Sequence, residues 1–175
     1  MSEFEFTLTF ALPDRAVETD DLIEKLGAAG CDEALVGVGR WGRLALSFRR
    51  EAETATTALA SALADVRRAE PQARLIEAAP DFVGLTDVAA LLGVTRQNVR
   101  NLILSCDAPA PVPVHEGKPT IWHFAKVLTW LREHKGYRIP QELVELAGAA
   151  MQVNLAVEAF DADGAAQQEL AGLLR

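Results

Sequence analysis

Four polar side chains of the types that commonly read DNA bases fall within six consecutive positions. They are Arg96, Gln97, Arg100 and Asn101. Arginine can donate two hydrogen bonds to guanine, and glutamine or asparagine can form a matching pair with adenine. On a helix over 96–104 these side chains point away from the apolar Val99 and Leu102. Thr95 can cap this helix, and its hydroxyl can hold a phosphate together with the helix N-terminus.

A second short helix comes just before and must position the first. Thr86 can cap a helix over 87–92, Gly93 offers a left-handed turn residue, and Ala89 lets two helices cross closely. Two short helices with a three-residue turn have helix-turn-helix geometry. The alternative is a helical hairpin with a solvated polar face. The base-reading residue types favour DNA binding over that alternative.

Residues 112–122 predict a small β wing after the two helices. The prolines between 108 and 114 exclude a helix there. Residues 115–119 contain glycine and proline, which is typical of a turn, and 120–122 reads as a strand.

The run Val83-Gly84-Leu85-Thr86-Asp87-Val88-Ala89-Ala90-Leu91-Leu92-Gly93-Val94-Thr95-Arg96-Gln97-Asn98-Val99, followed by a wing ending in Ile121-Trp122, resembles a known family. It is similar to the winged helix-turn-helix of the MerR and excisionase type, over roughly residues 82–135. The resemblance implies that the second helix enters the major groove, with Arg96, Gln97, Arg100 and Asn101 as base contacts. It also implies that the wing touches the DNA backbone through Lys118.

This chain departs from the family pattern in two ways. His123 follows Trp122 at the position where arginines often follow the wing. Lys126 is therefore the nearest basic residue that could contact a phosphate. The N-terminal segment does not resemble the effector domains of MerR proteins, which normally follow the DNA-binding domain.

Residues 1–80 predict a separate α+β domain. Phe4, Phe6, Leu8 and Phe10 alternate with polar residues, as on a strand with one buried face. A helix capped by Thr19-Asp20-Asp21 follows and ends at Gly27 and Gly30. The later elements are two strands over 34–38 and 44–48, a helix over 51–69 and a strand over 73–78. This βαββαβ order predicts a ferredoxin-like fold, with an antiparallel four-stranded sheet and two helices on one face.

The segment Gly37-Val38-Gly39-Arg40-Trp41-Gly42 fits the G-x-G-x-x-G pattern of dinucleotide sites. That site needs a helix next, whereas Leu44, Leu46 and Phe48 predict a strand. We therefore interpret the segment as a hairpin turn. Arg40 and Trp41 at its tip could touch a partner or ligand, or form ordinary surface.

The last part of the chain is predicted to be helical. One helix begins near Phe124 and ends at Gly136, and a longer one starts at Pro140. A heptad-like apolar seam occupies the second helix and consists of Ile139, Leu143, Leu146, Ala150, Val153, Val157 and Phe160. The seam can pack on its own domain or pair with a second chain. We favour a dimer, because two winged domains on a pseudo-palindrome bind DNA more tightly and specifically than one.

Three regions follow from these elements: a ferredoxin-like domain over 1–80, a winged helix-turn-helix over 81–138, and a C-terminal helical segment over 139–175 that ends in a short helix within 165–174.

The net charges of these regions differ. The formal net charge of the chain is −8, but residues 81–139 hold 7 Lys/Arg and 5 Asp/Glu. Residues 1–80 hold 9 and 14, and residues 140–175 hold 1 and 6. Because acidic surfaces repel phosphates, the flanks are expected to face away from DNA.

We expect no enzyme activity, metal or cofactor. His115, His123 and His134 have no Asp, Glu or Cys at metal-ligand spacing. Cys31 and Cys106 are expected to be reduced thiols. No apolar run approaches the roughly 18 residues that a membrane span needs. The N-terminus carries acidic residues, whereas a signal peptide begins with basic ones. The sequence therefore predicts a cytoplasmic protein without a membrane segment.

The combined prediction is a dimeric, sequence-specific DNA-binding protein of the bacterial regulator type. Its partners are double-stranded DNA, a second copy of the chain, and an optional small effector or protein at the N-terminal domain. The alternative is a protein-interaction adaptor or antitoxin-like module whose winged domain no longer binds DNA. The net charge of −8 favours this alternative slightly. A ligand sensor without a nucleic-acid role is a third interpretation.

Overall fold

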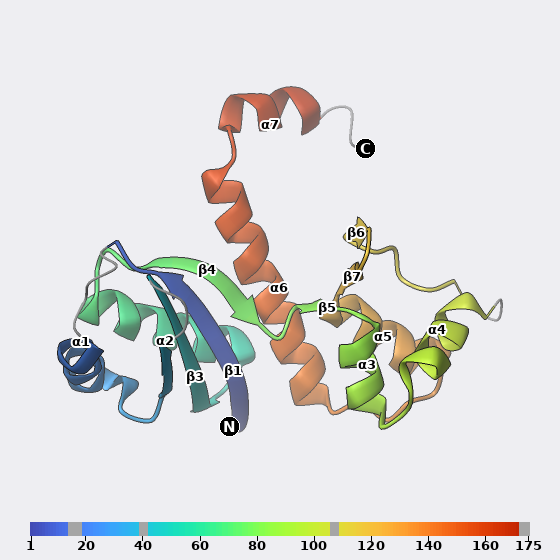
Figure 1. Cartoon of the computed structure of the whole chain (residues 1–175), viewed down its shortest axis with the longest axis horizontal. Helices are drawn as coiled ribbons and strands as arrows, with labels where there is room; N and C mark the ends of the chain where they lie inside the picture. The colour runs from blue at the N-terminus through green and yellow to red at the C-terminus, as the bar shows by residue number, and fades with distance from the viewer. Residues whose placement is uncertain (14–18, 39–41, 106–108, 172–175) are drawn as a thin grey trace.

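The computed structural model of the 175-residue chain describes residues 1–13, 19–38, 42–105 and 109–171. It is a mixed α+β protein with two antiparallel sheets. The two sheets lie on opposite sides of a long helix (Figure 1). Arg40, Trp41 and Cys106, which the sequence analysis singled out, lie outside the described residues.

The first sheet is built by the N-terminal half of the chain. Its strands are β1 (Ser2–Ala11), β2 (Leu35–Val38), β3 (Arg43–Ala52) and β4 (Arg74–Ala79). They are ordered β2-β3-β1-β4, and every neighbouring pair is antiparallel. Phe6 lies opposite Phe48, and their rings stack with centroids 5.4 Å apart. The alternating apolar residues of β1 all point into one core, as the period-2 pattern predicts.

The helices of this half are α1 (Thr19–Leu26), the π-helical turn η1 (Gly27–Cys31) and α2 (Ala55–Ala69). The predicted helix over 51–69 was wrong at its start. Residues 51 and 52 extend β3 instead, where they pair with Glu3 and Ser2. Thr54 then caps α2, its Oγ1 accepting a hydrogen bond of 3.1 Å from the Thr57 N–H. The element order βαββαβ is the one that the sequence predicts.

The second sheet and its helices come from the middle of the chain. The elements are β5 (Phe82–Val83), α3 (Leu85–Leu92), α4 (Arg96–Leu104), β6 (His115–Glu116), β7 (Thr120–His123) and α5 (Phe124–His134). The strands are ordered β5-β7-β6. A second core joins Val88, Val99 and Trp122 to the buried face of α5.

Helix α6 (Gln141–Asp161) contributes to both cores, and α7 (Gly164–Ala171) follows it. Leu146 and Ala150 lie in the first core and Ala147 in the second. The first core is thus covered by α6 in addition to the two predicted helices. By length and composition alone α6 could cross a membrane. Its buried residues are Leu146, Ala147, Ala149, Ala150 and Asn154, and most of the helix is partly or fully exposed.

The apolar seam of α6 is divided between these contacts and solvent. Leu143 packs on the second core, and Leu146, Ala150 and Val153 pack on the first. This is intramolecular packing, one of the two arrangements that the heptad spacing allows. The seam residue Phe160 remains 90 % exposed.

Candidate nucleic-acid interface

The turn between α3 and α4 depends on one glycine. Gly93 has φ +64°, in the left-handed region that most side chains avoid. The N–H of Val94 then donates to the Ala89 carbonyl at 3.0 Å, which closes the end of α3. The prediction that Thr86 caps α3 was wrong. Gly84 is the N-cap residue, and its N–H donates to Asp87 Oδ2 at 2.8 Å, so that a carboxylate within the first turn meets the helix start.

Helix α4 begins where predicted, because Thr95 caps it. Thr95 Oγ1 accepts a hydrogen bond of 3.2 Å from the Asn98 N–H. Val99 is 1 % exposed and packs in the same core as Val88 and Ala89 of α3. The buried Val99 fixes which side of α4 faces solvent. Among the described residues no acceptor takes the Thr95 hydroxyl hydrogen, which can therefore donate to a phosphate oxygen at the helix N-terminus.

All four base-reading candidates on α4 are exposed. They are Arg96, Gln97, Arg100 and Asn101. Within the described part of the chain, neither arginine has an acidic partner at ion-pair distance. Gln97 Nε2 donates to Asn101 Oδ1 at 3.0 Å, which holds the two amides together. Within the ranges that the structure describes, Gln97 Oε1 and the Asn101 amide hydrogens have no further partner. This acceptor and this donor are the groups that an adenine edge requires.

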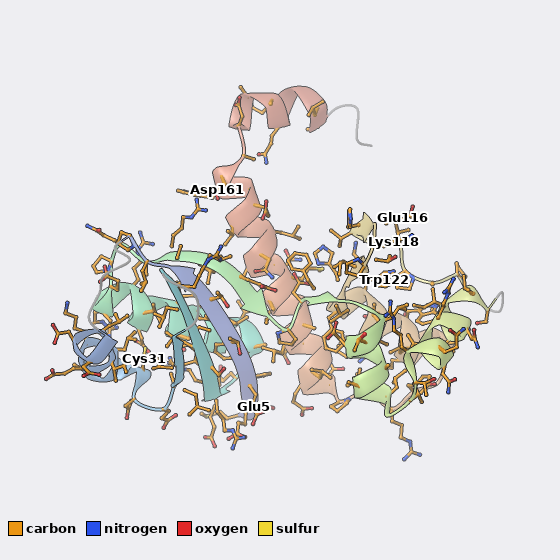
Figure 2. The ribbon with its side chains drawn as sticks, in the orientation of Figure 1. Glu5, Cys31, Glu116, Lys118, Trp122 and Asp161 are labelled. Carbon is orange, nitrogen blue, oxygen red and sulfur yellow. The ribbon has the colours of Figure 1, made fainter. Side chains whose placement is uncertain are left out.

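The hairpin β6–β7 presents Lys118 at its turn. His115 pairs with Ile121 and Glu116 with Thr120, so Lys118 stands in the turn, where its side chain is exposed. Figure 2 shows Lys118 and Glu116 together at this end of the molecule. Glu116 places a negative charge near the lysine, which lowers the positive potential available to a phosphate.

Trp122 anchors the hairpin to the proline-containing segment before it. Its side chain is 6 % exposed, and Nε1 donates to the Pro111 carbonyl at 3.0 Å. Lys126 lies on α5, not on the hairpin. It lines a hollow of about 550 Å³ together with Pro109 and Val112. The predicted contacts therefore come from three separate elements: α4, the hairpin and α5.

Sequence reasoning missed a buried polar cluster beside the hairpin. Asp81, His123 and Asn154 are 1, 7 and 4 % exposed. His123 Nδ1 lies 2.8 Å from Asp81 Oδ1, so this ring is directed inward and is not available to a phosphate. The signals that could have revealed the cluster are an acid directly after Pro80 and an asparagine in the middle of an apolar helix.

The clearest pKa shifts lie away from α4. Burial raises the pKa of the Cys31 thiol, and burial followed by the nearby Asp81 carboxylate raises the pKa of Glu77. Among the residues that the structure describes, no three His, Cys, Asp or Glu side chains gather as metal ligands do. The chemistry that the α4 surface offers is hydrogen bonding and positive charge.

Comparison with protein-family models, with curated proteins and with solved structures found no match for this chain.

Proposed function

We propose that the protein binds double-stranded DNA sequence-specifically, as a homodimeric bacterial transcriptional regulator of the cytoplasm. In this proposal residues 1–80 form a ferredoxin-like domain, residues 81–138 form a winged helix-turn-helix of the MerR type, and the C-terminal helices follow. Helix α4 enters the major groove, and the hairpin around Lys118 contacts the backbone.

One observation carries the proposal: α4 is anchored by a buried valine and exposes four base-reading side chains. Arg96 and Arg100 are free of acidic partners among the described residues, so binding guanine would not require breaking an ion pair. The coupled Gln97–Asn101 amides have fewer conformations to lose on binding adenine.

The distribution of charge supports an orientation in which α4 faces the DNA. The four-stranded sheet belongs to the acidic residues 1–80 and lies at the opposite end of the molecule from α4 (Figure 1). A duplex lying along α4 would therefore lie away from the four-stranded sheet of the acidic residues 1–80.

The test is selection of duplexes from a random DNA pool, followed by fluorescence anisotropy across a salt series. We expect a selected site bound far more tightly than bulk DNA, with affinity falling as salt rises. Arg96→Ala with Arg100→Ala should abolish that preference. Arg138→Ala removes an exposed arginine from outside α4 and should keep it. Lack of enrichment at low salt would reject the proposal.

A second candidate function is the protein-interaction adaptor, which the exposed face of the four-stranded sheet favours. This face carries a hollow of about 740 Å³ lined by Glu5, Thr7, Ser47 and Arg49. An adaptor should keep its protein partner when Arg96 and Arg100 are both replaced by Ala. A DNA reader should lose its specific site.

A further inference from the structure

An apolar groove lies beside the last two turns of α6. It has a volume of about 520 Å³ and runs between α6 on one side and the end of α2 with the start of β4 on the other. Leu63 and Leu75 form one wall, and Val153 and Val157 form the other. Phe10 closes the base.

The apolar side chain nearest the mouth of the groove is almost fully in solvent. Phe160 lines the groove, yet it is 90 % exposed. It is also the last residue of the apolar seam, of which five earlier members pack in the two cores of the chain. A large exposed aromatic next to an apolar hollow is typical of an interaction site.

Charges of both signs surround the groove. Its lining includes Arg67, Arg74 and Asp161, and Glu158 stands two positions before Phe160 on the helix. Arg74 pairs with Asp161 of its own chain at 3.1 Å. Arg67 is exposed and has no acidic partner within the described ranges. Asp161 is the last residue of α6, at the end that precedes α7 (Figure 2).

We propose that this groove is a homodimer interface, in which Phe160 of each copy enters the groove of the other. A surface that carries both a projecting aromatic and an apolar groove can complement itself across a two-fold axis. The same rotation brings the acidic helix end of one copy toward the Arg67 rim of the other. A small ligand in the groove would neither bury the exposed Phe160 ring nor pair with these charges.

The two Phe160 rings alone bury too little area for a stable dimer. A phenylalanine buries roughly 150–250 Å², whereas a specific interface buries about 1,200–2,000 Å² in total. The walls and rim of the groove must therefore supply most of the remainder. We expect association in the micromolar range, visible as a concentration-dependent equilibrium.

The inference deepens the homodimer part of the proposed function, and its test uses no DNA. Sedimentation velocity of the full chain should show a monomer–dimer equilibrium. Phe160→Glu should weaken dimerisation at least about tenfold, because each dimer loses two buried rings. Arg67→Glu should weaken it as well. Leu155→Glu changes a residue of the same helix that is 47 % exposed and lies outside the groove, so it should dimerise normally.

Circular dichroism first establishes that each variant is folded. A wild-type chain that stays monomeric up to about 100 µM would overturn the inference, as would equal effects of Phe160→Glu and Leu155→Glu. Anisotropy on a duplex with a single half-site separates the two proposals. If a monomeric protein binds this duplex, DNA recognition is supported and the dimer interface is rejected. A dimer that binds no DNA supports the interface and rejects the regulator.

Discussion

Asn154 of α6 donates a hydrogen bond of 2.8 Å from Nδ2 to Asp81 Oδ2, although 73 positions separate the two residues. The same amide exchanges two hydrogen bonds with Ala78 of β4, at 2.7 and 2.8 Å. The other Asp81 oxygen lies 2.8 Å from His123 at the end of β7. One buried asparagine therefore ties α6 to the segment that joins the two sheets.

Asn154→Ala should lower the free energy of unfolding by roughly 2 to 4 kcal/mol, because several buried polar groups lose their partners at once. Urea denaturation measures the loss. Gln152→Ala changes an exposed residue of the same helix and serves as the control, with an expected effect within about 0.5 kcal/mol. Equal denaturation midpoints for the two variants would show that the cluster contributes little.

Thr95→Ala should destabilise the protein by about 1 kcal/mol, because the Asn98 N–H loses its capping oxygen. Thr86→Ala is a matched control. Thr86 is exposed and resembles a cap in sequence, but Gly84 occupies the cap position of α3. Chemical denaturation should therefore separate the two threonines, and a larger loss at Thr86 would contradict the assigned cap.

Two glycines should respond in opposite directions to the same substitution. Gly93→Ala forces a Cβ into a left-handed residue and should cost about 1 to 2 kcal/mol. Gly148 lies inside α6, where an added Cβ meets nothing within 4 Å. Gly148→Ala should stabilise the protein by roughly 0.5 to 1 kcal/mol, because alanine favours a helix. Thermal midpoints that shift in the same direction would contradict this assignment.

The sequence predicts the local elements of this fold well, because their signals are local. The alternating residues of β1, the glycine at 93 and the cap at Thr95 each act within a few positions. The error at residues 51 and 52 has a different origin. Helix propensity favoured a helix there, but pairing with the distant β1 holds these residues in β3.

In the candidate site, too, the features set by local spacing could be predicted, and those set by distant contacts could not. The exposed face of α4 follows from helical spacing, so all four predicted side chains share it. The Asp81–His123–Asn154 cluster joins three segments that are distant in sequence, and no local spacing brings them together. Likewise, the heptad spacing of α6 does not reveal that most of the seam packs on the two cores of its own chain.

Glu77→Gln should stabilise the protein at neutral pH and have little effect at low pH. Burial, and then Asp81, raise the pKa of Glu77 above its ordinary value of 4.5. The folded state therefore binds this proton more readily than the unfolded chain, so the contribution of Glu77 to stability falls as pH rises from 4.5 through the raised pKa. The variant lacks this titration. Urea midpoints across that range measure the difference, and a constant difference at every pH would contradict the assignment.

Arg100→Ala and Lys118→Ala should affect DNA binding in different ways if α4 reads bases and the hairpin contacts the backbone. Arg100→Ala should cost about 1 to 3 kcal/mol on the selected duplex and little on bulk DNA, because a bond to a base edge is lost. Lys118→Ala should weaken both duplexes alike and reduce the slope of log affinity against log salt by about 1. Anisotropy titrations on both duplexes measure these effects. If Lys118→Ala changed specificity while Arg100→Ala did not, the assigned roles of α4 and the hairpin would be reversed.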